Sequence, residues 1–137
     1  DALISMKCLD QGVDVPEARI GVFLSSTKNS QQFVQRRGRI LRKSEGKHEA
    51  LLFDMIVRPP LSDDTTPSEK RLLRSELSRA AELAYFADNK DEQLIGLREY
   101  ALSYKLEEDF PIPWLDGEKP TLEVISATNL EADTLSA

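Results

Sequence analysis

The side chains best suited to chemistry in this 137-residue sequence are a group of arginines with a glycine among them. Residues 31–43 read QQFVQRRGRILRK and hold five basic side chains and no acidic one, although the chain has a formal net charge of −6. Arginine stays charged at any relevant pH, and its planar guanidinium can grip two phosphate oxygens at once. The stretch therefore indicates either a site for a phosphate group or a solvated basic face of a helix.

The spacing of these residues favours a phosphate site. On a helix, Gln35, Gly38, Arg39 and Arg42 lie at positions i, i+3, i+4 and i+7 and share one face. A glycine inside a helix costs about 1 kcal/mol relative to alanine, so Gly38 calls for a reason such as the close approach of a ligand or of another backbone. A solvated face would instead carry interspersed glutamates and no glycine.

Charge is distributed unevenly along the chain. Residues 1–58 contain 10 basic and 7 acidic side chains, whereas residues 59–137 contain 8 basic and 17 acidic ones. The first half is thus the candidate for an anionic partner, while the acidic second half argues against a protein that coats nucleic acid with its whole surface. With one cysteine and one histidine in the sequence, Cys8 and His48, neither a disulfide nor a zinc cluster is expected.

Apolar runs in the first half predict an α/β fold. Residues 2–6, 19–25 and 48–57 read as strands, and the continuous run 19–25 suits a parallel sheet covered on both faces. A capping-box pattern at Asn29 and Gln32 predicts a helix from about residue 30 to residue 41. Strands alternating with a crossover helix are typical of a parallel sheet. No run reaches the roughly 20 apolar residues that span a bilayer, so we expect a cytoplasmic protein without membrane contact.

The second half predicts a pair of helices after a boundary near residue 60. Thr66 and Glu69 form a capping-box pattern with Pro67 at the first helical position, and a second such pattern at Asn89 and Glu92 predicts a helix reaching Lys105. Apolar residues recur at helical spacing in both helices, which favours core packing over a partner-binding surface. The apolar positions are Leu73, Leu77, Ala80, Ala84 and Ala87, then Leu94, Ile95, Leu97, Ala101 and Leu102.

Two stretches resemble motifs of superfamily 2 helicases. Residues 35–42, QRRGRILR, resemble motif VI, whose pattern is Gln-x-x-Gly-Arg-x-x-Arg, and residues 2–16 resemble motif V with its Gly-x-Asp-x-Pro core. The order and spacing of the two motifs are also those of the family, and the sequence is most similar to the DEAD/DEAH-type, XPB-like and restriction-associated branch. The resemblance covers residues 1–58.

The resemblance implies a role for each matching residue. Arg39 and Arg42 match arginine fingers that reach the γ-phosphate of ATP, while Gln35 and Gly38 belong to the part of motif VI at the nucleotide. In motif V, Asp14 matches a carboxylate that accepts hydrogen bonds from the ribose, although a turn-forming aspartate before Pro16 is the alternative. Gly12 matches a glycine that lets the backbone approach the nucleotide. Ser5 and Lys7 match positions that face the nucleic-acid backbone.

The resemblance also implies a missing partner domain. The sequence contains no phosphate loop and no Asp-Glu pair at the end of a strand to hold Mg²⁺. We therefore expect ATP and its Mg²⁺ to be held by an N-terminal RecA-like domain outside these residues. The expected nucleic-acid partner is DNA or RNA. The expected domains are the C-terminal half of the second RecA-like domain (1–58), a linker (59–66), a helical hairpin (67–109) and a tail or linker (110–137). A helicase-derived module that binds nucleic acid or protein without ATP turnover remains the alternative.

Overall fold

The structure is a computed structural model, and it describes residues 15–24, 37–106 and 112–119. The strand predicted at residues 2–6 and most of the helix predicted from residue 30 lie outside this part of the chain. The fold divides into two compact units, Asp1–Met55 and Ile56–Ala137. We describe each unit by itself, and the finer domain limits suggested by the sequence stay predictions.

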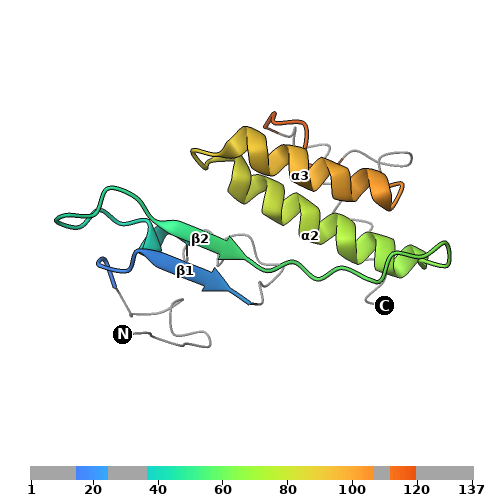
Figure 1. Ribbon diagram of the computed structural model, residues 1–137, viewed down its shortest axis with the longest axis horizontal. Helices are drawn as coiled ribbons and strands as arrows, with labels where there is room; N and C mark the ends of the chain where they lie inside the picture. The colour runs from blue at the N-terminus through green and yellow to red at the C-terminus, as the bar shows by residue number, and fades with distance from the viewer. Residues whose placement is uncertain (1–14, 25–36, 107–111, 120–137) are drawn as a thin grey trace. The chain divides into compact units, whose positions relative to one another are not determined.

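The first unit contains a pair of parallel strands. β1 covers Ile20–Phe23 and β2 covers Leu51–Asp54, and Ile20 pairs with Leu51 in a register that continues to Phe23 and Asp54 (Figure 1). The amides of Leu51 and Met55 extend the ladder by donating to the carbonyls of Arg19 and Phe23, at 2.8 and 2.9 Å. The predicted α/β class and the parallel pairing of these two runs are confirmed, although each strand is shorter than its apolar run.

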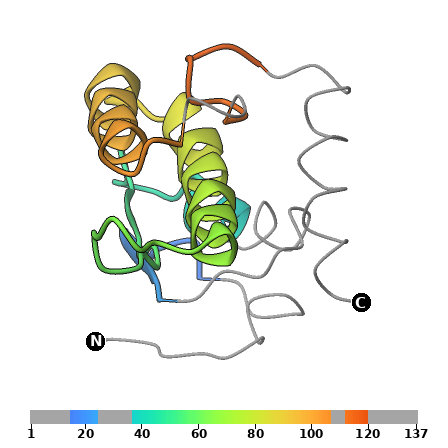
Figure 2. The same ribbon diagram turned by 90° about the vertical axis from the view of Figure 1, so that its right-hand side faces the viewer.

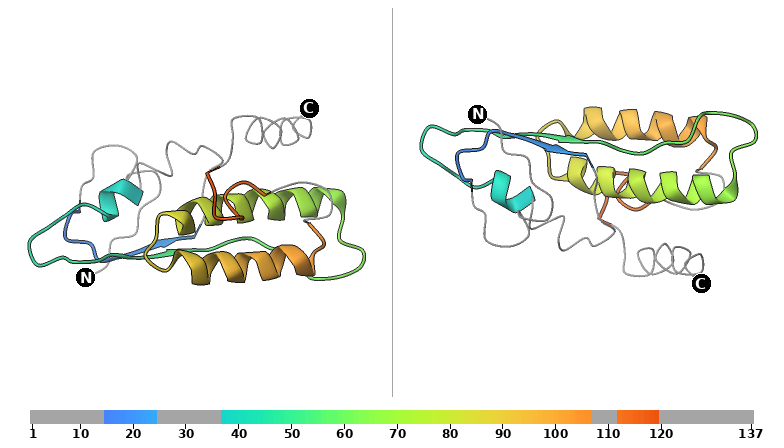
Figure 3. Two further views of the ribbon diagram at one scale, coloured as in Figure 1. Left: turned by 90° about the horizontal axis from the view of Figure 1, so that it is seen from above. Right: turned by 90° about the horizontal axis from the view of Figure 1, so that it is seen from below.

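Burial alternates along β1, because one face of the strand pair is covered and the other is open. Gly21 and Phe23 are buried, whereas Ile20, Val22 and Leu24 are 60%, 54% and 74% exposed. A short helical segment, residues 37–40, lies on one side of the strands (Figure 3). Coverage on both faces was predicted from the continuous apolar run and is wrong for the described residues, since period-2 alternation places Ile20, Val22 and Leu24 on the side opposite Gly21 and Phe23.

The first helix of the second unit begins at the predicted capping box. α2 covers Pro67–Tyr85, and its N-cap Thr66 accepts a hydrogen bond from the amide of Glu69 at 3.3 Å. The Glu69 carboxylate in turn accepts from the amide and the hydroxyl of Thr66, at 2.8 Å each. These bonds lower the pKa of Glu69, the backbone bond being the larger cause. Local capping chemistry therefore sets the start of α2.

The second helix begins without the predicted cap. α3 covers Lys90–Ser103, and its N-cap Asn89 makes no side-chain hydrogen bond to the helix. Asn89 has φ −96° and ψ 32°, whereas a side-chain cap requires an extended backbone at this position. The prediction of a capping box at Asn89 and Glu92 is wrong for this reason, and the helix ends two residues before Lys105.

α2 and α3 pack side by side as the predicted helical pair (Figure 2). Leu73, Leu77 and Ala81 are fully buried on α2 and meet Leu94 and Ala101 of α3 in one cluster. The predicted stripe on α2 is largely confirmed, with Ala81 in place of Ala80 as the fully buried alanine. On α3 the stripe divides, because Ile95 and Leu102 are 56% and 60% exposed.

The residues after α3 complete this core. Ile112 and Leu115 are 4% and 2% exposed and belong to the same buried cluster, although the sequence predicted a tail or linker there. Trp114 packs against the rings of Tyr85 and Phe86, with centroids 5.0 and 5.7 Å away. The helix pair leaves an apolar surface that the short segment covers, so burial here follows from the neighbouring helices.

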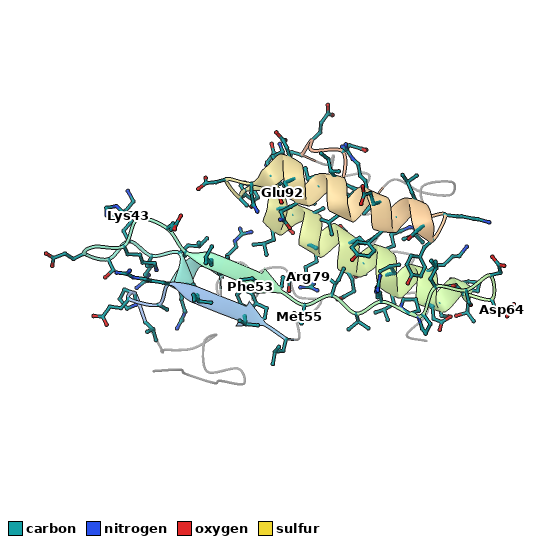
Figure 4. The ribbon with its side chains drawn as sticks, viewed as in Figure 1. Lys43, Phe53, Met55, Asp64, Arg79 and Glu92 are labelled. Atoms are coloured by element: carbon teal, nitrogen blue, oxygen red, sulfur yellow. The ribbon has the colours of Figure 1, made fainter. Side chains whose placement is uncertain are left out.

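Polar side chains link the ends of this unit to backbone carbonyls. Buried Arg74 donates to the carbonyl of Leu106 at 3.1 Å, and the Tyr104 hydroxyl donates to the carbonyl of Pro59. Glu76 accepts from the amide of Val57 at 3.0 Å and from Arg79, labelled in Figure 4, at 2.9 Å.

Among the described helices, none combines the length and the apolar character needed to cross a membrane.

Candidate phosphate-binding site

The described part of the arginine-rich stretch is anchored on the strand pair by one buried side chain. Residues 37–40 are helical, and the amide of Leu41 donates to the carbonyl of Arg37 at 3.0 Å. Ile40, 8% exposed, reaches the backbone of Gly21 in β1, where a Cβ atom would lie 2.5 Å from Ile40 Cδ1. Glycine at position 21 therefore allows the helical segment to approach the strand closely.

This anchor leaves the neighbouring residues of the stretch on the accessible side. Gly38 is exposed, and nothing lies within 4 Å of the position that a Cβ would occupy there. Arg39 is half-buried and Arg42 is exposed. The close approach of another backbone that the sequence suggested at Gly38 is therefore not seen among the described residues, and the approach of a ligand there stays a prediction.

The structure corrects the position of Arg42. The helical segment ends at Ile40, so Arg42 lies in the following loop and does not continue the helical face of Gly38 and Arg39. A helix leaves its last carbonyls without intrahelical partners, and here a lysine from the next turn bonds that of Ile40 together with a carbonyl of the following loop. Lys47 donates from Nζ to the carbonyls of Ile40 and Arg42, the latter at 3.0 Å.

The same lysine reaches the segment that resembles motif V. Its Nζ also donates to the carbonyl of Pro16 at 3.0 Å. Pro16 stands in a turn in which the amide of Ala18 donates to the carbonyl of Val15 at 3.0 Å. One ammonium group therefore bonds the end of the motif V-like segment and the end of the motif VI-like segment. Lys47 lies 31 positions after Pro16 along the chain.

Five of the predicted site residues lie outside the described part of the chain: Ser5, Lys7, Gly12, Asp14 and Gln35. Their proposed roles stay predictions. Within the described residues, no group of three or more His, Cys, Asp or Glu side chains gathers as a metal site would. Arg39 and Arg42 stay candidates for phosphate contact, because a guanidinium suits phosphate oxygens.

Two residues that shape this region were missed by reasoning from the sequence. Gly21 stood in an apolar run, where an isolated glycine within a strand is itself a signal of close backbone approach. Lys47 lies in a turn, because the amide of Lys47 donates to the carbonyl of Ser44 at 3.1 Å and Gly46 has φ 72°. A lysine near the C-terminal end of a helix is a known signal for bonding to the last carbonyls.

The described geometry defines an α/β unit with parallel strands, whose helical segment ends in a basic loop. In a comparison with known protein families, residues 1–44 match the model of the helicase conserved C-terminal domain. Residues 1–44 are thus similar to part of a helicase C-terminal domain, and the chain has distant similarity to proteins of superfamily 2.

Two relatives illustrate this similarity. The DNA 3'-5' translocase XPB2 of Sulfurisphaera tokodaii is 38% identical over 56 residues, which are 41% of this chain and 12% of that protein. A protein named "Putative helicase 22" from Sulfolobus islandicus filamentous virus is 28% identical over 83 residues, 61% of this chain and 15% of that protein. The chain therefore spans less than a sixth of the length of either relative. No solved structure matches the chain.

Proposed function

We propose that this chain is the C-terminal motor-domain segment of an ATP-dependent DNA helicase or translocase. Its role is to supply arginine fingers and a ribose contact to an ATP site that it shares with an N-terminal RecA-like domain. The match of residues 1–44 to the helicase C-terminal domain carries this proposal, because that range contains both motifs and both proposed fingers. The similarity to a DNA translocase supports DNA as the track.

The proposed chemistry is electrostatic stabilisation of phosphoryl transfer. ATP with its Mg²⁺, held by the N-terminal domain, supplies the phosphoryl group and the metal charge. Arg39 and Arg42 place guanidinium donors toward the charge that develops on that group, which is the part an arginine finger performs in such motors. Asp14 accepts from the ribose, and Gly12, Gln35 and Gly38 line the nucleotide. Ser5 and Lys7 contact the DNA backbone.

Catalysis in this arrangement depends on domain closure. The fingers belong to one domain and the phosphate loop to another, so hydrolysis proceeds only when the two domains come together. Each cycle of closing and opening moves the motor along a strand. The 137 residues alone are accordingly expected to be inactive as an ATPase.

Replacement of Arg42 by alanine tests the proposal in the complete motor, that is, these residues joined to the domain with the phosphate loop. We expect Arg42→Ala to lower the DNA-stimulated ATPase rate by about 10³- to 10⁵-fold, the usual contribution of an arginine finger. ATP binding, measured by titration with a fluorescent nucleotide, should be largely unchanged.

Lys43→Ala is the matched control, since it removes an adjacent exposed positive charge. It should leave the ATPase rate near that of the wild type. Full ATPase activity in Arg42→Ala would rule out the finger assignment. A wild-type motor that binds DNA without stimulated hydrolysis would favour a non-catalytic binding module.

A further inference from the structure

Lys47 uses its whole hydrogen-bonding capacity on backbone carbonyls of the candidate site. An ammonium group has three N–H donors and no acceptor. Those donors meet the carbonyls of Pro16, Ile40 and Arg42. The first carbonyl follows the proposed ribose-binding residue Asp14 by two positions, and the third belongs to a proposed finger. One side chain therefore bonds the backbone of both motif-like segments.

The fold holds Lys47 in place from the other side. The Ser44–Lys47 turn is closed by a backbone hydrogen bond of 3.1 Å, and Gly46 adopts the positive φ of 72° that glycine accepts without strain. Arg19 donates from Nη2 to the carbonyl of Gly46 at 3.2 Å, while its own carbonyl accepts from the amide of Leu51 at 2.8 Å. Arg19 thus links the Ser44–Lys47 turn to the start of the β1–β2 ladder, and this link restrains the backbone of Lys47.

Lys47 contacts Arg42 at a point beyond the end of the helical segment. The backbone of Arg42 is not held by a continuing helix, and its carbonyl is bonded by Lys47 at 3.0 Å. We propose that Lys47 is a positioning residue, which sets the backbone of the proposed finger Arg42 against the loop that contains Pro16. This inference rests on the proposed function and adds a residue that neither motif contains.

The predicted effect on catalysis follows from the bond to Arg42. The bond to Arg42 is exposed, so water can replace the ammonium at that carbonyl when Lys47 is removed. The backbone of Arg42 then loses its bond to Lys47, and its position can shift while the carbonyl keeps a partner. A displacement of about 1 Å in a group that positions reacting atoms can cost about 10²-fold in rate.

Lys47→Met in the complete motor is the test, with Lys43→Met as the matched control. Lys43, labelled in Figure 4, is an exposed lysine in the same loop. We expect Lys47→Met to lower kcat by about 10- to 100-fold. The KM for ATP should stay within about twofold of the wild type, since an interaction needed only in the transition state changes kcat. Lys43→Met should behave as the wild type.

A double-mutant cycle separates positioning from general destabilisation. If Lys47 acts through Arg42, then Lys47→Met should cause no further loss of single-turnover rate in the Arg42→Ala background, because coupled residues are not additive. A structural role would lower the rate again in that background. Should Lys47→Met reduce the folded fraction, Lys47→Gln keeps two N–H donors and is expected to fold with an intermediate kcat.

The outcomes also distinguish this inference from the proposed function. If Arg42→Ala retains full ATPase, the finger assignment fails and Lys47 has nothing to position. If Arg42→Ala is inactive but Lys47→Met and Lys47→Gln keep the wild-type kcat, the proposed function stands and this inference is overturned. An additive loss in the double variant overturns it as well.

Discussion

Gly21→Ala probes how closely the arginine-bearing segment is seated on β1. A Cβ at position 21 would lie 2.5 Å from Ile40 Cδ1, which is 0.9 Å shorter than the 3.4 Å at which ordinary contact begins. It would also lie 3.0 Å from Leu52 Cδ2. Ile40 must therefore leave its rotamer, or the helical segment that carries Arg39 must move away from the strand by about 1 Å, and such overpacking costs about 1 to 3 kcal/mol.

Hydrogen exchange of the strand amides measures this cost in the unit concerned. The amides of Leu51 and Met55 bond across the β1–β2 pair, so their exchange reports its opening free energy. We expect Gly21→Ala to speed exchange by about 5- to 150-fold, which corresponds to the range of about 1 to 3 kcal/mol. In the complete motor, the same change should lower kcat through the displaced fingers.

Ile40→Val supplies the compensating change, because valine lacks the Cδ1 atom that lies closest. Alone it should cost about 0.5 to 1.5 kcal/mol. Combined with Gly21→Ala it should give a loss smaller than the sum of the two single losses, with a coupling of about 0.5 to 3 kcal/mol. Additive losses, or unchanged exchange in Gly21→Ala, would refute the close-approach argument.

Gly96→Ala is the matched glycine control. No atom lies within 4 Å of the position that its Cβ would take, and Gly96 lies inside α3. Alanine should therefore stabilise that helix by about 0.5 to 1 kcal/mol, the opposite sign to the effect at Gly21.

Two further predictions concern the helical unit. Leu77→Ala, at a fully buried position, should cost about 2 to 5 kcal/mol in urea unfolding, whereas Leu72→Ala, 45% exposed on the same helix, should cost far less. Because the hydrogen bonds from Thr66 lower the pKa of Glu69 in the folded state, their contribution is present above the pKa of the unfolded chain. This contribution to the free energy of unfolding should be lost as pH falls through the pKa that Glu69 has in the folded state. Glu69→Gln has no carboxyl group to titrate, so its stability should not show this fall. The same dependence of stability on acid pH in Glu69→Gln as in the wild type would contradict the argument.

Local patterns in the sequence determined much of the fold. The apolar run around Val22 and the run around Phe53, the latter labelled in Figure 4, predicted parallel strands that the structure contains. The Thr66–Glu69 capping box and the apolar spacing after it predicted α2, because both depend on residues within one or two turns. The two motif-like stretches likewise indicated the helicase C-terminal domain, since a motif is readable within its own residues.

Contacts between distant residues were decided only by the tertiary structure. Lys47 meets Pro16 across 31 positions, and Gly21 meets Ile40 because a strand and a later helical segment pack together. Leu115 is buried only because a helix pair offers it a surface. Arg42 illustrates the limit most directly, since its spacing suggested a shared helical face while the actual end of the helix places it in a loop. Spacing gives the face of a helix, whereas the end of that helix here depends on partners brought by the rest of the fold.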